Sequence, residues 1–164
     1  MQQSLKIKKN TIIIVVMGVV LVLDQVTKAI LTAKIEPLGS VEVVAGLFSI
    51  VNVANRGAAF GMFKGGGALV LILIAIAALI LITYLLYTSR ERLTVLSLSL
   101  IGAGALGNLI DRIRLSEVVD FLDFHLGAYH WPAFNVADIA ISVGVLLYLV
   151  TIYRCGGSGE QEAD

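Results

Sequence analysis

Four uncharged, apolar runs divide the chain, at residues 10–23, 65–89, 93–110 and 139–153. A helix needs about 20 mostly apolar residues to cross the hydrocarbon core of a bilayer. The second run reaches that length and the third nearly does. The first run reaches it only by including Asp24 and Lys28, and the fourth only by including Asp138. The pattern predicts four transmembrane helices, at about residues 11–31, 66–88, 93–110 and 134–153.

A basic cluster, Lys6, Lys8 and Lys9, precedes the first run and is also typical of a cleaved signal peptide. Three further apolar runs follow and no small-residue cleavage site is evident, so we interpret this run as an uncleaved helix. The 12 Lys and Arg divide evenly between the two sides of the membrane. The density of basic residues at short helix ends nevertheless favours cytoplasmic termini.

Four spans leave two segments on the other side of the membrane, residues 32–64 and 111–133. The first contains β-branched runs at 41–44 and 48–53, bounded by glycines, which predict a small β structure. We interpret the second, short and rich in acids and aromatics, as a loop. Residues 1–154 are expected to form a single membrane domain, and the glycine-rich tail 155–164 to be disordered.

Composition supports a membrane protein. Hydrophobic residues make up 58% of the chain, charged residues 15%, and the mean hydropathy is +0.93. These values exclude most soluble enzymes. Twelve basic and twelve acidic residues cancel, so no cationic excess favours a nucleic-acid partner.

Polar residues in and beside the predicted spans collect at the membrane face that carries both connecting segments. They are Asp24, Lys28, Asn55, Arg56, Asn108, Asp111, Arg112, Asp120, Asp123, Asn135 and Asp138. Ionisable groups at such positions are costly unless paired or hydrated, and they mark a functional site by default.

Structural explanations stay open for several of these residues. Asp24 and Lys28 are four apart and suit a local ion pair in which Lys28 snorkels outward. Asp111 and Arg112 suit a charge pair at headgroup level, and Arg56 suits a lipid phosphate. Ala103 and Gly107 have the small-residue spacing of closely packed helices.

Asp138 is harder to explain structurally, because no basic residue lies within a helical turn of it. A partner carboxyl that shares one proton would reduce the cost of burying it, and Asp120 is the natural candidate. Two neighbouring carboxyls do not both ionise readily, so one stays protonated and the other charged. Such a pair can activate water for attack on an amide.

Other proteolytic chemistries lack their motifs. The sequence has no His-Glu-x-x-His zinc motif and no Gly-x-Ser-x-Gly nucleophile motif. We interpret His125 and His130 as loop residues without an evident serine partner. No metal site and no cofactor is therefore expected.

Five motifs in this order resemble the bacterial lipoprotein signal peptidases (signal peptidase II). They are DQVTK at 24–28, NVANRGAAFG at 52–61, GAGALGNLIDR at 102–112, VVDF at 118–121 and FNVAD at 134–138. The resemblance implies four inner-membrane helices with cytoplasmic termini, and a β-cradle and active site at the outer face. It also implies a metal-independent aspartyl endopeptidase with Asp120 and Asp138 as its catalytic dyad.

The same resemblance implies roles for the other polar residues. Those expected to line the site and bind substrate are Asn55, Asn108, Arg112 and Asn135. Those expected to support it are Asp24, Lys28, Arg56 and Asp111. The implied substrate is a prolipoprotein whose cysteine carries diacylglycerol, cleaved just before that cysteine by a monomer surrounded by membrane lipids.

Two other classes of function are weighed against the peptidase. An ion or proton carrier needs polar residues through the bilayer depth, whereas the second and fourth runs are apolar along nearly all their length. A non-catalytic assembly protein accounts for the small-residue packing, and it predicts that Asn is tolerated at positions 120 and 138.

Overall fold

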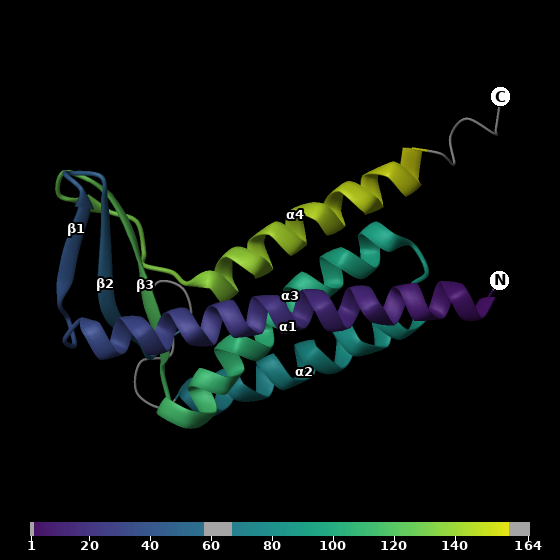
Figure 1. Ribbon diagram of the computed structural model, residues 1–164, viewed down its shortest axis with the longest axis horizontal. Helices are drawn as coiled ribbons and strands as arrows, with labels where there is room; N and C mark the ends of the chain where they lie inside the picture. Colours follow the sequence, from purple (N-terminus) through teal and green to yellow (C-terminus); the bar gives the residue numbers. More distant parts are fainter. Residues whose placement is uncertain (1, 58–66, 158–164) are drawn as a thin grey trace.

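The computed structural model describes residues 2–57 and 67–157, and its order of elements is simple. The elements are α1 (Gln2–Lys34), β1 (Ser40–Val44), β2 (Phe48–Asn55), α2 (Gly67–Thr88), α3 (Arg92–Leu115), β3 (Val118–Leu126), β4 (Tyr129–His130) and α4 (Val136–Gly157). In the described part of the chain, four helices are long and apolar enough to cross a membrane. Four membrane helices and a small β structure, as predicted, are thus confirmed (Figure 1).

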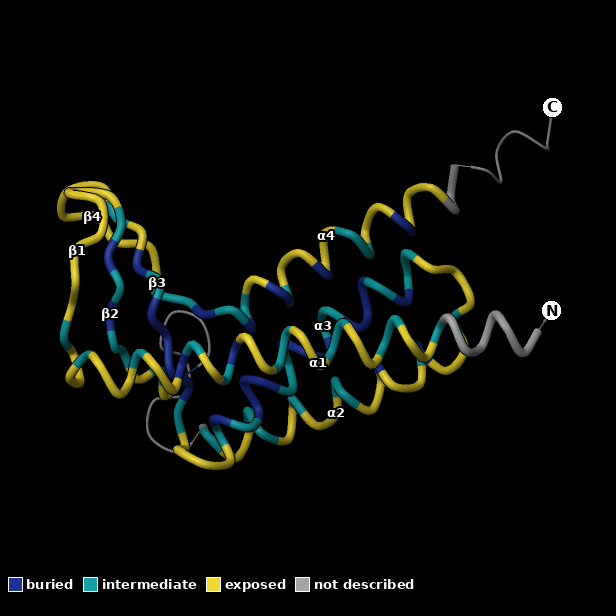
Figure 2. The backbone as a smooth tube through the Cα atoms, in the orientation of Figure 1, coloured by how far each residue is buried: buried dark blue, intermediate teal, exposed yellow. Residues whose placement is uncertain are grey.

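Helix α3 is the centre of the bundle, in contact with α1, α2 and α4. In its most apolar window 56% of the residues are buried, against 11–22% in the other three helices. The other helices therefore expose long faces, as Figure 2 shows, and large hydrophobic side chains are numerous among their exposed residues. In a bilayer such faces contact lipid rather than water.

Helices α3 and α4 approach each other closely because glycine lies at both sides of their contact. A Cβ on Gly104 would lie 2.3 Å from the carbonyl oxygen of Ala137. One on Gly144 would lie 2.8 Å from the carbonyl oxygen of Ser97. Backbone-to-backbone packing of this kind is the usual result of small residues in membrane helices.

The two connecting segments form one antiparallel sheet with the order β1-β2-β3-β4. Interpreting residues 111–133 as a loop was wrong, because β3 pairs with β2 and places Asp120 opposite Val53. His125 and His130 are paired strand residues, not loop residues. The sheet lies at the end of the bundle where α1 ends and α4 begins, and α1 begins and α4 ends at the opposite end (Figure 1).

Two helix boundaries differ from the prediction in ways that matter for the site. Helix α3 continues to Leu115 instead of residue 110, so Asp111 and Arg112 are helical. Helix α4 starts at Val136, so Asp138 is its third residue and not five residues inside it.

At its other end α4 includes residues 155–157, which the sequence assigned to a disordered tail. Residues 158–164, and residues 58–61 of the second motif, lie outside the described residues.

Candidate active site

Asp138 is positioned by the cap of α4. The Asp138 backbone N–H donates to Asn135 Oδ1 at 3.0 Å, and the Asn135 backbone N–H donates to Asp138 Oδ2 at 3.1 Å. This reciprocal pair is a capping box, with Asp in the place of the usual Glu or Gln. The Asn-x-x-Asp spacing before an apolar run is a helix-start signal in the sequence, but the cap was not among the predictions.

Asp120 enters the same site from β3. Its carboxyl is buried, with 3% of the residue exposed. Asn135 Nδ2 donates to Asp120 Oδ1 at 2.7 Å, and Asn55 Nδ2 donates to Asp120 Oδ2 at 2.9 Å. Both oxygens of the carboxyl therefore have a fixed amide donor.

Asn108 of α3 connects the two carboxyls from the third side. Its Nδ2 donates to Asp138 Oδ1 at 2.8 Å, and its Oδ1 accepts from Asn135 Nδ2 at 3.2 Å. Asn135 thus bonds to both aspartates, and one α3–β3–α4 network brings Asp120 and Asp138 together. Asn135 is fully buried and Asn108 nearly so, which suits them to hold the carboxyls more than to contact substrate.

Burial raises the pKa of Asp120 to about 6. The nearby Asp138 carboxyl raises this pKa further, whereas the hydrogen bonds from Asn55 and Asn135 lower it. A carboxyl with such a pKa exchanges a proton near neutral pH, as a general acid or base must.

A buried ion cluster supports this network from α1. Lys28 Nζ lies 2.7 Å from Asp111 Oδ2 and 2.9 Å from Asp24 Oδ2, and it donates to Asn108 Oδ1 at 3.3 Å. Lys28 is only 4% exposed, so the expectation that it snorkels outward was wrong. Asp111 pairs with Lys28 in place of the suggested pair with Arg112.

Asp24 links this cluster to α4, because its Oδ1 accepts from the Ala137 backbone N–H at 3.0 Å. Gln25 completes the cluster and was missed. Its Nε2 donates to Asp111 Oδ1 at 3.0 Å and to Asp24 Oδ2 at 3.1 Å. Gln25 belongs to the DQVTK motif, but an uncharged amide at the end of a span gave no separate signal.

The two remaining cations lie differently. Arg112 is half-buried, its Nη1 donates to the Asn108 carbonyl at 3.3 Å, and its charge interacts with Asp120 and Asp138. Arg56 lies outside the network, because its exposed guanidinium pairs with Glu117 at 3.0 Å.

The sheet also contains a serine–histidine contact that the sequence did not reveal. Ser49 Oγ lies 3.1 Å from His125 Nε2, but the neighbouring Asp123 pairs with His130 at 2.9 Å. His125 Nδ1 is buried and has no hydrogen-bond partner, so the contact lacks the acid that orients a catalytic histidine. Within residues 2–57 and 67–157, no three His, Cys, Asp or Glu side chains are grouped to hold a metal ion.

Comparison with known proteins assigns this chain to a family. Residues 16–154 match the family model described as signal peptidase (SPase) II. The lipoprotein signal peptidase of Nitratidesulfovibrio vulgaris is 43% identical over 151 residues, covering 89% of this chain and 92% of the relative. That of Geobacter metallireducens is 47% identical over 145 residues, covering 85% and 89%. A bacterial membrane enzyme solved by the in meso method at 2.3 Å superposes with a TM-score of 0.80, at 34% identity and 87% coverage of each chain.

Proposed function

We propose that Asp120 and Asp138 form the catalytic dyad of a membrane aspartic protease. The premise is that this chain belongs to the signal peptidase II family. Membership makes the chain a multi-pass bacterial membrane protein that removes signal peptides from prolipoproteins. The observation that supports the dyad is the network in which Asn135 bonds to both carboxyls.

The proposed reaction needs only the two carboxyls and water. The ionised carboxyl takes a proton from water, whose oxygen bonds to the scissile carbonyl carbon, while the protonated carboxyl donates to the carbonyl oxygen. The tetrahedral intermediate then collapses: its hydroxyl returns a proton to the carboxylate that donated it, and the carbon–nitrogen bond breaks. The departing nitrogen takes up the proton that the other carboxyl removed from water. General acid and base catalysis of this kind contributes about 10² to 10⁴-fold to a rate.

The amides and Arg112 have distinct roles in this proposal. Asn108 and Asn135 are positioning residues, since their amide groups hold the carboxyls and are almost inaccessible. Asn55 is less buried and fixes Asp120 from β2. Arg112 is half-buried and directs its charge toward the dyad, so it is the group best suited to stabilise the developing oxyanion or to bind the peptide backbone.

The substrate we propose is a prolipoprotein whose cysteine already carries diacylglycerol, cut just before that cysteine. The dyad lies where helices α3 and α4 meet the sheet, which corresponds to the boundary between acyl chains and headgroups. A lipid attached to the cysteine holds the scissile bond at this depth. Partitioning into the membrane therefore supplies much of the positioning that catalysis requires.

We also propose that the enzyme lies in the inner membrane with both termini cytoplasmic and the dyad at the outer face. Short basic segments support this orientation, since Lys9, Arg90, Arg92 and Arg154 all lie at the end opposite the sheet. A monomer suffices, because a single chain supplies every residue of the network. Nothing in its balanced charge favours nucleic acid.

Two isosteric variants, Asp120→Asn and Asp138→Asn, test the dyad. Each purified variant is assayed on a diacylglyceryl-modified prolipoprotein, and each is expected to lose at least about 10²-fold in cleavage rate. Asp123→Asn is the matched control, because Asp123 lies on the same strand but pairs with His130. It should retain near-normal cleavage.

Near-normal cleavage by either dyad variant would overturn the assignment of Asp120 and Asp138 as the dyad. Melting temperatures of all three variants in detergent separate a lost reaction from a lost fold. A chelator and a thiol reagent provide a further check, because the proposed chemistry uses neither a metal nor Cys155.

A further inference from the structure

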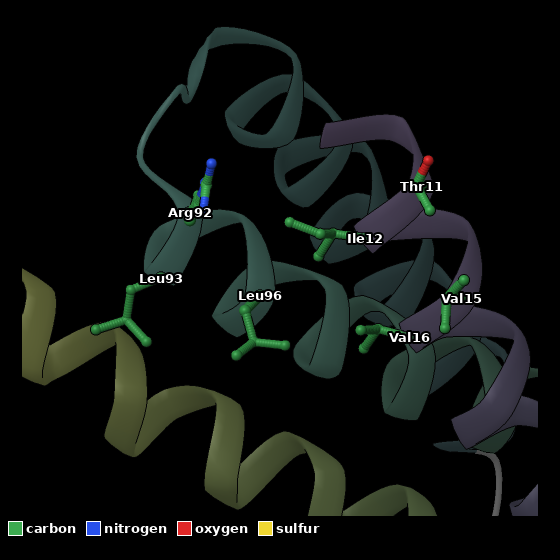
Figure 3. Close-up of a pocket in the computed structure, with 7 residues that line it drawn as sticks. All are labelled: Thr11, Ile12, Val15, Val16, Arg92, Leu93 and Leu96. Carbon is green, nitrogen blue, oxygen red and sulfur yellow. The ribbon is translucent and has the colours of Figure 1, made fainter. Parts of the chain in front are cut away.

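A cavity of about 510 Å³ opens at the end of the bundle farthest from the dyad. Its lining residues are Thr11, Ile12, Val15, Val16, Arg92, Leu93 and Leu96, from α1 and α3 (Figure 3). Arg92 is the first residue of α3, whereas the residues of the dyad network lie near the other end of that helix. The cavity is therefore separate from the active site.

The cavity forms a groove within the membrane-spanning part of the protein. Five of its seven lining residues are aliphatic, and Val15 is 54% exposed although it lies inside a span. Helix α4 diverges from α1 toward this end of the bundle (Figure 1). In a bilayer the occupant that matches such a surface is an acyl chain.

The rim of the groove carries a positive charge. Arg92 is exposed, and among the described residues no carboxylate forms an ion pair with it. The carboxylate of Glu91 accepts from the Leu93 and Thr94 backbone N–H groups, which holds it on the cap of α3. Lys9 donates to the Tyr87 and Ser89 carbonyls. The guanidinium of Arg92 is thus available to an anion at this rim.

We propose that this groove binds an anionic phospholipid, with one acyl chain along the aliphatic side chains and the phosphate at Arg92. The competing occupant is the signal peptide of the substrate, which must run from the dyad toward this end. The positively charged start of a signal peptide is repelled by Arg92, whereas a lipid phosphate is attracted to it. Charge therefore favours the lipid.

Native mass spectrometry of the delipidated full chain tests the site. Phosphatidylglycerol and phosphatidylcholine with identical acyl chains are the probes, and we expect the wild type to bind phosphatidylglycerol more tightly. Arg92→Gln should lower the affinity for phosphatidylglycerol about fivefold. This change corresponds to about 1 kcal/mol, the value for one basic residue at an anionic surface. Arg114→Gln, an exposed arginine at the other end of α3, is the control and should leave binding unchanged.

A second pair of variants tests the groove itself. Val15→Trp fills it and should weaken the binding of both lipids, whereas Ile14→Trp, at a position 71% exposed outside the groove, should not. Prolipoprotein cleavage by each variant reports that it is folded. If Val15→Trp does not fold, the phosphatidylglycerol affinities of Arg92→Gln and the wild type still test the proposal.

Equal affinity for the two lipids, or unchanged phosphatidylglycerol binding by Arg92→Gln, would overturn the proposal. A raised KM for prolipoprotein in Val15→Trp, with lipid binding intact, would assign the groove to the signal peptide and would also overturn it. Neither result bears on the dyad, which is tested separately by Asp120→Asn and Asp138→Asn.

Discussion

Asp120 and Asp138 reach one site by different local routes. Asp138 is fixed by the helix cap that it forms with Asn135, on the first turn of α4. Asp120 is fixed by a strand register and by two amide donors. Because the second route buries the carboxyl more completely, burial raises the pKa of Asp120 to about 6. This asymmetry suggests which carboxyl holds the proton.

We predict that Asp120 begins the reaction as the general acid and Asp138 as the base. A carboxyl whose pKa is raised is protonated below that pKa, so the acid form of Asp120 is lost as pH rises through about 6. The kcat/KM for a diacylglyceryl-prolipoprotein should therefore fall on the alkaline side. A profile that falls only on the acid side would reverse the two roles.

Asn55→Ala sharpens this assignment. The variant removes a hydrogen bond that lowers the pKa of Asp120, so the pKa rises further and the alkaline limb of kcat/KM should move to higher pH. Ser49→Ala, on the same strand but bonded to His125, is the control and should leave the limb in place. If the alkaline limb of kcat/KM stays at the same pH in Asn55→Ala, the group that titrates in this limb is not Asp120.

Lys28 is the cation of the buried ion cluster that adjoins the proposed dyad. Lys28→Met leaves the carboxylates of Asp24 and Asp111 buried without their cation, and breaking a buried pair this way costs about 3–5 kcal/mol. Arg56→Gln removes an exposed pair with Glu117 and should cost about 1 kcal/mol or less. Thermal unfolding of both variants in one detergent compares them. Similar losses of stability would show that the Lys28 cluster is not the support that its burial indicates.

At the scale of elements, the contact between α3 and α4 determines how closely Asn108 approaches Asp138. Gly104→Ala would place a Cβ 2.3 Å from the Ala137 carbonyl, so the helices must separate. Overpacking typically costs about 1–3 kcal/mol, and here it also lengthens the hydrogen bond from Asn108 to Asp138. We expect lower stability and a reduced kcat.

Gly18→Ala is the matched control for that prediction. Gly18 also lies in a membrane helix, but a Cβ there meets no atom within 4 Å. Alanine is the better helix former, so the variant should be as stable as the wild type or slightly more stable. Equal behaviour of the two alanine variants in melting and cleavage assays would contradict a role for the α3–α4 contact in positioning.

The elements also show what the sequence can and cannot predict. Apolar runs predict the membrane helices because crossing a bilayer depends on the length and apolarity of the segment itself. The last turn of α3 was not predicted because Asp111 is stabilised there by Lys28 and Gln25, which are partners on another helix. Strand β3 was not predicted for a similar reason. Its acidic residues are typical of a loop, and they are buried only because β3 pairs with β2. The inward direction of Lys28 likewise depends on tertiary contacts.

At the scale of the whole molecule, the fold separates two ends with different chemistry. The sheet lies at one end, where α4 begins, and the start of α1 and the end of α4 lie at the other (Figure 1). The network of Asp120 and Asp138 belongs to the first end and the basic rim of the groove to the second. The sequence predicted the polar residues of the first end, because ionisable side chains beside spans are rarely without a role. Most of the residues that line the groove at the second end are ordinary aliphatic residues of membrane helices, so no sequence pattern marks it.

This polarity makes the orientation in the membrane testable with single cysteines in a Cys155→Ser background. Tyr129→Cys lies on the sheet at a position 87% exposed, and Arg90→Cys lies in the exposed turn between α2 and α3. If basic helix ends remain in the cytoplasm, a membrane-impermeant maleimide should label Tyr129→Cys in intact cells. The same reagent should label Arg90→Cys only after the membrane is permeabilised. The reverse pattern would place the dyad at the cytoplasmic face, where it would not meet a signal peptide whose cysteine has crossed the membrane.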